Sequence, residues 1–437
     1  MSQPWYREVS RQQWKTFLTT FAAWTLDAFD FTILTFVLLD IQRSFEVNRG
    51  LAGLLGTVTL LFRVVGGIGA GTLADRYGRK GPILFSIAWY TLFAFLSGLS
   101  TTYVMLFAFR GLFGIGMGGM WAAGMPLALE QWPAKHRGIA SGILQGGYSF
   151  GFLLSSLVYQ LGYPMISDRP EWAWRIMLWA GVVPAIVVFG LMWRVPESPV
   201  WLDKRRQMKA QGQAARISLA RLFDKDVRWA TIHTSLLMGG FVSMYQSTTF
   251  WYPTLLGVLK QQPLAFLLLL NAGGLIGSVA LGALSEKWGG RRGAATLGVT
   301  LGLLAAPMFL FSSNSWLLLL GAWLIGFFAS GAWGIVPGYL SERFPTEARG
   351  VGTGFTYHVG VGLGSFAPYL IGRLQDGGTD LRTAMLTCIL TAGVFVIALL
   401  WLGPETRGRT LDGDACLECV RCLAYLSGGY PECRGWI

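Results

Sequence analysis

The chain has little charge for its size. Asp, Glu, Lys and Arg make up only 13% of its 437 residues, and 53% are hydrophobic, whereas a soluble globular protein carries roughly a quarter charged residues. This composition excludes a large water-exposed surface. Because a transmembrane helix takes about 20 mostly apolar residues, the length suits twelve such helices with short connections and one longer loop.

Histidine and cysteine are also scarce, with three and five residues. No arrangement of Ser, His and Asp, or of Cys with His, indicates a catalytic site, so we expect no enzyme, no cofactor and no resident metal. Cys416, Cys419 and Cys422 have the spacing of metal ligands, but the pattern supplies no fourth ligand. We therefore interpret residues 413–437 as a cytoplasmic tail, and expect Cys388, in an apolar run, to pack as a free thiol.

The formal net charge of +12 does not indicate a nucleic-acid partner. Lys and Arg sit in short clusters between apolar runs, as they do at a membrane surface. The first sixteen residues have no apolar core before a cleavage site, so we expect no removable signal peptide. The glycines of residues 66–71 follow no strand and precede no Lys-Ser or Lys-Thr pair, so they favour close helix packing over a nucleotide loop.

Twelve apolar stretches follow one another, six before and six after a charged segment at 195–229. Basic residues cluster in every second connection, so the positive-inside rule places both termini and this segment in the cytoplasm, and the chain in the plasma (inner) membrane as a multi-pass protein. We expect an N-terminal bundle over 1–194, a central loop over 195–229 and a C-terminal bundle over 230–412. The stretches run approximately over 17–40, 51–72, 82–100, 103–128, 139–163, 174–194, 230–257, 263–284, 294–312, 315–339, 351–373 and 383–403.

Three motifs of the first half recur in the second at nearly one displacement. Residues 71–80 (GTLADRYGRK) are echoed 211 positions later by 282–289 (GALSEKWG). The EQWP motif at 130–133 is echoed 212 positions later by ERFP at 342–345, and PES at 196–198 is echoed 208 positions later by PET at 404–406. The repeats imply a duplicated six-helix half, an architecture that places a solute site between the halves near the membrane midplane.

These motifs resemble those of the major facilitator superfamily over residues 15–412. The 71–80 segment is similar to the family's loop signature, and Arg110 with the glycines of 114–118 is similar to its fourth-helix signature. Residues 26–31 (LDAFDF), 61–67 (LFRVVGG), 116–119 (GMGG) and 130–133 (EQWP) resemble the sialate:proton symporter group, which includes sialic acid carriers and lactate-type monocarboxylate permeases.

The resemblance implies an all-α membrane protein with twelve transmembrane helices in two pseudo-symmetric six-helix bundles. Two positions depart from it. Met120 stands where members of the group often carry an acidic residue, and the His and Asp of the fungal lactate permease signature are missing around Gln246. The roles of those residues are therefore not carried over to this chain.

Few ionisable residues fall within the apolar stretches, where a charge costs about 2.5 to 3.5 kcal/mol on insertion scales. Asp27 and Asp30 lie three apart and share a helix face. We expect one of them to exchange protons and couple solute movement to the proton gradient; the alternative is that an Arg neutralises one and fixes helix packing. Arg63 either binds an anionic solute through two parallel hydrogen bonds or is the counter-ion of Asp27 or Asp30.

Arg110 and His358 are further candidates. In the family that the chain resembles, an Arg like Arg110 is linked to proton transfer; an ion pair or bonds to backbone carbonyls are the alternative. His358 is a candidate for proton or substrate contact, because imidazole changes charge near physiological pH, and a buried neutral His is the alternative. Uncharged candidates for lining the solute path are Gln145, Tyr148, Tyr245, Gln246, Asn271, Trp333 and Tyr357.

The polar loop after the second stretch is expected to lie outside the hydrocarbon. In the family that it resembles, this loop holds helices together in one of two access states. We expect Asp75 to contact the cytoplasmic end of the eleventh helix; the alternative is turn chemistry from the loop glycines. The gating candidates are Gly71, Asp75, Arg76, Gly78, Arg79 and Lys80.

Together these observations predict a secondary active carrier that imports an organic carboxylate with a proton, by rocking two bundles about a central site. The anion would pair with Arg63 or Arg110 and change the proton affinity of Asp27, Asp30 or His358. A lactate-type monocarboxylate is preferred over sialic acid because the aromatic candidates suit a small anion. The alternatives are a proton-coupled exporter of hydrophobic cations or drugs and a non-transporting sensor on a carrier fold. We expect a monomer whose partners are the solute, the proton and the lipid bilayer.

Overall fold

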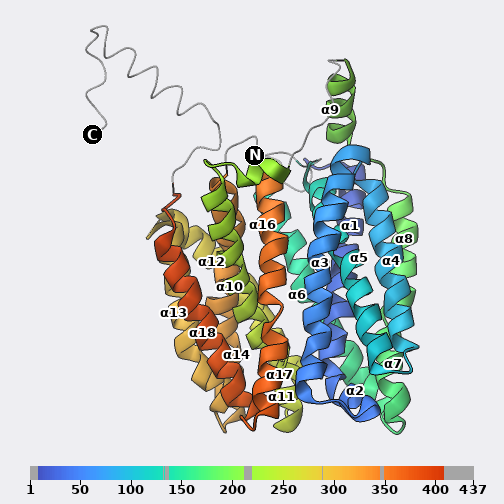
Figure 1. The fold of residues 1–437 in the computed structure, drawn as a ribbon, viewed down its shortest axis with the longest axis vertical. Helices are drawn as coiled ribbons and strands as arrows, with labels where there is room; N and C mark the ends of the chain where they lie inside the picture. Colours follow the sequence, from blue (N-terminus) through green and yellow to red (C-terminus); the bar gives the residue numbers. More distant parts are fainter. Residues whose placement is uncertain are drawn as a thin grey trace.

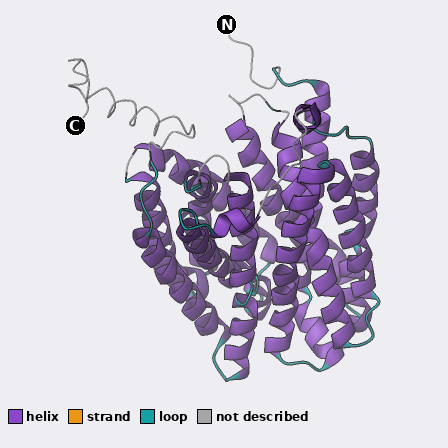
Figure 2. Ribbon diagram, turned by 45° about the horizontal axis from the view of Figure 1, so that its top comes forward, coloured by secondary structure: helices purple, strands orange, loops and turns teal. Residues whose placement is uncertain are grey.

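The computed structural model describes residues 8–130, 132, 137–210, 219–287, 289–344 and 349–407. Within these residues all regular secondary structure is helical, and the long helices run nearly side by side from one end of the molecule to the other (Figures 1 and 2). We call α1 to α8 the first half and α10 to α18 the second half. The short helices α9 (Pro199–Ala210) and η4 (Leu219–Phe223) lie between them in the chain.

The chain crosses the molecule six times in each half, and several crossings consist of two helices in sequence. The first half contains α1 (Arg11–Phe36) with α2 (Leu38–Phe45), α3 (Arg49–Tyr77), α4 (Lys80–Gly98), α5 (Tyr103–Glu130), α6 (Arg137–Gly162), and α7 (Pro170–Trp179) with α8 (Val182–Trp193). The second half contains α10 (Arg228–Thr249) with α11 (Tyr252–Val258), α12 (Pro263–Lys287), α13 (Gly290–Phe311), α14 (Ser315–Ile325) with α15 (Val336–Glu342), α16 (Arg349–Gly364) with α17 (Ala367–Asp376), and α18 (Leu381–Leu402). Each apolar stretch predicted from the sequence falls on one crossing.

Nine helical segments in the described part of the chain are long and apolar enough to span a membrane. The other three crossings are α6, α10 with α11, and α16 with α17. α16 and α17 have 16 and 10 residues, so each alone is shorter than a typical transmembrane helix. α6 packs on α1 and α12, and α16 packs on α10 and α3, so both helices contribute to the contact between the halves.

Proline accounts for several of the breaks within crossings. Pro253, Pro337 and Pro368 each lie in the first turn of a short helix, α11, α15 and α17. Proline lacks a backbone N–H, so it fits the first turn of a helix and interrupts one that would continue through it. The second half consequently has three interrupted crossings, and α17 in one of them packs on α3 of the first half.

The two ends of the molecule differ in charge. We call the end that carries the α3–α4 and α12–α13 connections, with Arg79 and Arg291, the basic face. The end that carries the α2–α3 and α17–α18 connections is the opposite face.

At the opposite face the halves touch backbone to backbone. α17 packs along α3, and a Cβ atom added at Gly53 would overlap the carbonyl of Pro368, as one added at Gly372 would overlap the carbonyl of Arg49. Within the second half, the indole N–H of Trp251 donates to the same Pro368 carbonyl at 3.0 Å. Glycine permits this approach because it has no side chain, and the molecule is closed between α3 and α17 at this face.

Candidate functional site

A buried ion pair lies between α1 and α3. Asp27 is fully buried and Arg63 is 3% exposed, and the Asp27 Oδ2 and Arg63 Nη2 atoms are 3.9 Å apart. The Arg63 guanidinium carbon also lies 5.3 Å from the centroid of the Trp24 ring, within cation–π range. Trp24 and Asp27 are three residues apart and face α3 together. In this conformation Arg63 is the counter-ion of Asp27.

Asp30 has different surroundings. Arg110 on α5 donates from Nη2 to the backbone carbonyl of Asp30 at 3.3 Å, and its guanidinium carbon lies 4.9 Å from the Phe113 ring centroid. The Asp30 carboxylate has no hydrogen-bond partner among the described residues, and it lies against Gly181, where a Cβ atom would overlap it. The two acids point inward, as their spacing predicts, but each meets a different arginine.

His358 and Tyr357 on α16 meet the first half. Tyr357 stacks on Trp121 of α5 with ring centroids 4.0 Å apart and planes 1° apart, and His358 meets the same indole edge-on at 5.5 Å. The His358 ring sits on Gly67 of α3, where any Cβ atom would overlap it. Both ring nitrogens lack a hydrogen-bond partner in the described part of the chain. This aromatic layer joins the halves on the basic-face side of Arg63.

A small cavity, with room for about one water molecule in this conformation, lies between α1, α6 and α10. It brings together three of the predicted lining residues, Tyr148, Tyr245 and Gln246. Tyr148 also connects the cavity to the ion pair, because its ring packs 5.6 Å from that of Trp24. The lining residues that the sequence did not single out are Phe31, Thr32, Thr35, Phe152, Thr249 and Phe250.

The remaining lining candidates lie outside this cavity. Trp333 packs edge-on against Tyr245 with centroids 6.1 Å apart, so it supports the cavity wall from behind. Asn271 donates to the Leu267 carbonyl of its own helix at 2.8 Å. Gln145 lies on α6, partly buried, in the basic-face half of that helix.

The gating loop forms a network at the basic face of the first half. Arg79 Nη2 bonds Glu130 Oε1 at 3.2 Å, and Ser198 Oγ donates to the other oxygen of Glu130 at 2.5 Å. The backbone N–H groups of Arg79 and Lys80 both donate to Glu197, at 2.9 and 3.1 Å.

Four gating candidates remain. Gly78 has a φ of 111° and lies against Glu197, and Arg76 packs over Tyr77. A Cβ atom added at Gly71 would lie 3.7 Å from that of Ala122 on α5, an ordinary van der Waals distance. Asp75 lies on α3, but its side chain falls outside the part of the chain that the structure describes, so its expected contact with the eleventh helix stays a prediction.

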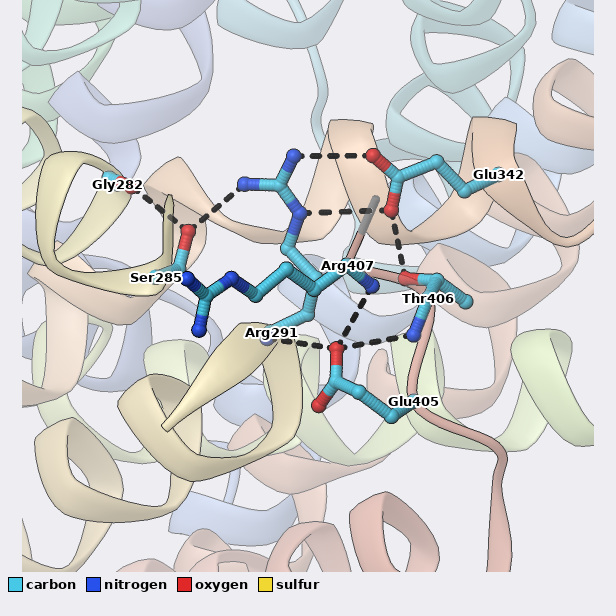
Figure 3. A network of polar contacts seen from close by, with 7 residues as sticks. All are labelled: Gly282, Ser285, Arg291, Glu342, Glu405, Thr406 and Arg407. Atoms are coloured by element: carbon cyan, nitrogen blue, oxygen red, sulfur yellow. Dashed lines mark hydrogen bonds and ion pairs between the residues drawn. The ribbon is translucent and has the colours of Figure 1, made fainter. Parts of the chain in front are cut away.

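The second half repeats this network bond for bond (Figure 3). Arg291 Nη2 bonds Glu342 Oε1 at 2.9 Å, and Thr406 Oγ1 donates to Glu342 Oε2 at 2.6 Å. The N–H groups of Arg291 and Arg292 donate to Glu405 at 2.9 and 3.1 Å. Ser285 Oγ accepts a further bond from Arg291 at 2.7 Å.

The structure corrects the register of the first repeat. The sequence pairs Gly78 with Gly289, but Gly290, with a φ of 67°, is the residue that lies against Glu405 as Gly78 lies against Glu197. The loop of the second half therefore has one additional residue, and its arginine is displaced by 212 positions rather than 211.

Glu405 offers a test of this network by pH. Burial raises the pKa of its carboxyl, but four N–H donors, on Arg407, Arg291, Arg292 and Thr406, together outweigh burial and hold the pKa below its ordinary value of 4.5. A carboxyl with a depressed native pKa stabilises the fold above its ordinary pKa, and that contribution disappears as the pH falls through the native pKa.

Glu405→Gln is therefore expected to lower the Tm of the purified protein at pH 7. The difference from the unchanged protein should shrink as the pH is lowered below about 4.5, as followed by intrinsic tryptophan fluorescence in detergent. Glu46→Gln, an exposed position at the opposite face, is the control. A difference that persists unchanged at pH 3 would contradict the assignment.

No group of three or more His, Cys, Asp or Glu able to hold a metal occurs among the described residues. Cys416, Cys419 and Cys422 lie outside those residues. Cys388, within them, is a free thiol.

Sequence reasoning missed three residues that complete the site. Trp24 lies within cation–π range of Arg63, and Trp121 stacks on Tyr357. Gly67 is the residue against which the His358 ring packs. Trp24 had a detectable signal, because it lies one helical turn before Asp27. Trp121 had none, since its partner lies on a helix of the other half.

Comparison with known proteins identifies the family of the chain. The family model described as "Major Facilitator Superfamily" matches residues 20–368 and 264–415. A probable 4-methylmuconolactone transporter of Cupriavidus pinatubonensis is 32% identical over 412 residues, 93% of this chain and 94% of that protein. A sialic acid transporter of Escherichia coli is 27% identical over 414 residues, 94% of this chain and 98% of that protein.

Among solved structures, the crystal structure of a D-xylose–proton symporter superposes with a TM-score of 0.72 at 20% identity, over 91% of this chain and 99% of that one. That likeness supports the fold of two six-helix halves. The relatives are named as transporters, so the chain is a carrier of solutes and not an enzyme. The chain belongs to the Major Facilitator Superfamily.

Proposed function

We propose that this chain is a proton-coupled symporter of small organic carboxylates that works by alternating access. The observation that carries the proposal is the pair of Asp27 and Arg63, buried between α1 and α3 beside an aromatic-walled cavity. An ion pair at such depth is costly unless it does something that an apolar pair cannot do. Exchange of partners, in which Arg63 takes the carboxylate of the solute while Asp27 takes a proton, is such a task.

The distance between Asp27 and Arg63 favours an exchange of ionic partners over a permanent structural ion pair. At 3.9 Å the closest atoms of Asp27 and Arg63 form an ion pair without a hydrogen bond, because such bonds between charged groups are usually about 2.7 to 2.9 Å long. Donor groups of Arg63, its Nε and Nη2, have no hydrogen-bond partner in the described part of the chain. A solute carboxylate would supply the two parallel bonds that the guanidinium favours.

Asp30 and Arg110 are the second pair of residues in the coupling proposal. The Asp30 carboxylate is buried without a donor, so the neutral, protonated form suits its surroundings when the site is closed. Arg110, held at the Asp30 carbonyl, lies close enough to stabilise the ionised form after a side-chain rotation. His358 lies on the basic-face side of the pair and would contact the proton or the solute on its exit.

The cavity walls favour a solute with a flat or ring-shaped body. Tyr148, Tyr245, Phe31, Phe152 and Phe250 supply the aromatic surface. The names of the two relatives above point the same way, since 4-methylmuconolactone and sialic acid are both carboxylates on a ring. We therefore extend the substrate class from lactate-type monocarboxylates and sialic acid to unsaturated ring carboxylates, and place these first.

The basic face is assigned to the cytoplasm of the plasma (inner) membrane. On this assignment residues 195–229 are a cytoplasmic linker between the bundles and 413–437 a cytoplasmic tail.

Uptake by purified protein in proteoliposomes tests the proposal. With an imposed inward proton gradient, we expect accumulation of at least one radiolabelled acid from a panel of 4-methylmuconolactone, benzoate, sialic acid and lactate, and its collapse when a protonophore is added. Benzyl alcohol, which has the six-membered ring of benzoate but no carboxylate, is the matched control and should not compete with the labelled acid for uptake. Efflux of a cationic dye without uptake of any acid would instead establish the exporter, and binding without flux would establish a sensor.

A further inference from the structure

Asp376, the last residue of α17 in the second half, reaches across the interface to the first turn of α3 in the first half. Its Oδ1 accepts from the N–H of Arg49 at 3.0 Å, and its Oδ2 accepts from the N–H of Gly50 at 2.9 Å. We call this contact the Asp376 clasp. None of the motifs in the sequence includes it, and it lies at the opposite face, far from the basic-face networks.

The first turn of α3 is completed by both halves of the protein. A helix begins with N–H groups that have no partner within the helix. Asn48, the residue before α3, accepts from the N–H of Leu51 at 2.8 Å, as a local cap does. The N–H groups of Arg49 and Gly50 are left to Asp376, so the second half supplies the cap that the first half lacks.

A carboxylate suits this position electrostatically, because the N-terminal end of a helix carries partial positive charge. The neighbouring backbones fix its approach. A Cβ atom at Gly50 would lie 2.8 Å from Asp376 Oδ2 and 2.6 Å from the side chain of Arg373, so the carboxylate fits only because residue 50 is glycine. Asp376 is exposed to solvent, and water can replace both bonds when the halves separate. The contact is therefore reversible.

We propose that the Asp376 clasp is the lock that holds the opposite face closed in this conformation, and that it sets the balance between the two access states. The inference rests on the proposed carrier function. Asp376 is a positioning residue in this account: it touches no solute and acts through the separation of α3 from α17. Breaking the clasp shifts the population toward the state that is open at the opposite face.

Cysteine accessibility measures this shift directly. Thr35 lines the cavity and lies one residue before the end of α1 at the opposite face, so Thr35→Cys, in a chain whose native cysteines are replaced by serine, reports opening from that side. With a charged, membrane-impermeant maleimide added at the opposite face, Asp376→Ala is expected to raise the labelling rate about three- to tenfold, the range that corresponds to the typical net contribution of one hydrogen bond in water. Asp376→Glu should restore most of the protection.

Two neighbours serve as matched controls. Asp380 is an exposed acid at the same face that caps only its own helix, by accepting from the N–H of Arg382 at 3.0 Å. Asp380→Ala should leave labelling unchanged. Asn48→Ala removes the local cap of α3 without touching the second half, and it should lower Tm without raising the labelling rate.

Transport supplies an independent reading. A larger population open at the opposite face lowers the apparent KM measured from that side, while slower closure lowers the maximal rate, so Asp376→Ala should reduce both. General misfolding would lower the maximal rate alone. The proposal is overturned if Asp376→Ala labels like the unchanged protein, or if Asp380→Ala labels as fast as Asp376→Ala. An absence of uptake by the unchanged protein would instead refute the carrier function, since labelling needs no solute.

Discussion

Asp27→Asn is expected to abolish proton-driven accumulation of the carboxylate substrate. The substitution leaves Arg63, which is 3% exposed, without its counter-ion. Breaking a buried pair by removing one partner costs about 3 to 5 kcal/mol, which corresponds to a factor of roughly a hundred or more in an equilibrium. Initial uptake under an imposed pH gradient should fall to background, and counterflow of labelled for unlabelled substrate, which needs no gradient, measures what binding remains.

A double variant separates lost coupling from lost folding. Asp27→Asn with Arg63→Gln removes both charges, so no uncompensated ion is left in the bundle, and the folded yield should recover. Accumulation should not recover, because neither the proton site nor the anion site is present. Arg63→Lys keeps the charge but loses the planar fork and should weaken substrate binding while leaving the protein folded.

Asp40→Asn is the matched control for this series. Asp40 is a buried acid on α2, directly after α1, and it accepts from the Tyr163 hydroxyl at 2.6 Å within the first half. The Asp40→Asn variant should transport the acid at a rate close to that of the unchanged protein. If Asp27→Asn still accumulates the acid against its gradient, Asp27 does not carry the proton, and the same measurement on Asp30→Asn decides whether Asp30 does.

Gly66→Ala is expected to have the largest effect on folding. A Cβ atom at Gly66 would overlap the backbone carbonyl of Ile115 on α5. Backbone atoms cannot move aside as a flexible side chain does, so α3 and α5 would have to separate, and overpacking of this kind costs about 1 to 3 kcal/mol or more. The displacement would also move Arg63, one helical turn away, so both Tm and uptake should fall.

Gly69→Ala is the control on the same helix. No atom lies within 4 Å of a Cβ built at Gly69, and alanine is about 1 kcal/mol better than glycine inside a helix. This variant should melt at the same temperature as the unchanged protein or higher. Equal Tm values for the two variants would show that α3 and α5 are not in backbone contact at Gly66.

The sequence was sufficient for most of the architecture. Apolar stretches of spanning length predict the crossings, because lipid requires a continuous apolar run, and the repeated motifs predict two related halves. Helix breaks were harder to predict. The predicted stretch 351–373 covers most of α16 and α17, since the pattern of hydrophobic residues continues across residues 365 and 366, where the helix is interrupted before Pro368.

The site was predictable where its cause is local. Asp27 and Arg63 stand out because charge is rare in apolar stretches, but the sequence alone left open whether Arg63 pairs with Asp27 or with Asp30. Contacts between halves have no such signal. The stacking of Trp121 on Tyr357 joins residues 236 positions apart, and Asp376 reaches Arg49 across 327. Such contacts depend on the relative placement of two bundles, which no pattern within one helix encodes.

The duplicated Arg–Glu networks have a mechanical consequence. Each joins helix ends of a single half, Arg79 with Glu130 in one and Arg291 with Glu342 in the other. Each network therefore makes its own bundle more rigid. The described contacts between the bundles, such as the bond from the Thr57 hydroxyl to the Ser365 carbonyl, are either uncharged or exposed to water. Tilting one bundle against the other then breaks few charged contacts, so the free energy that gives the movement its direction comes from binding of the proton and the solute.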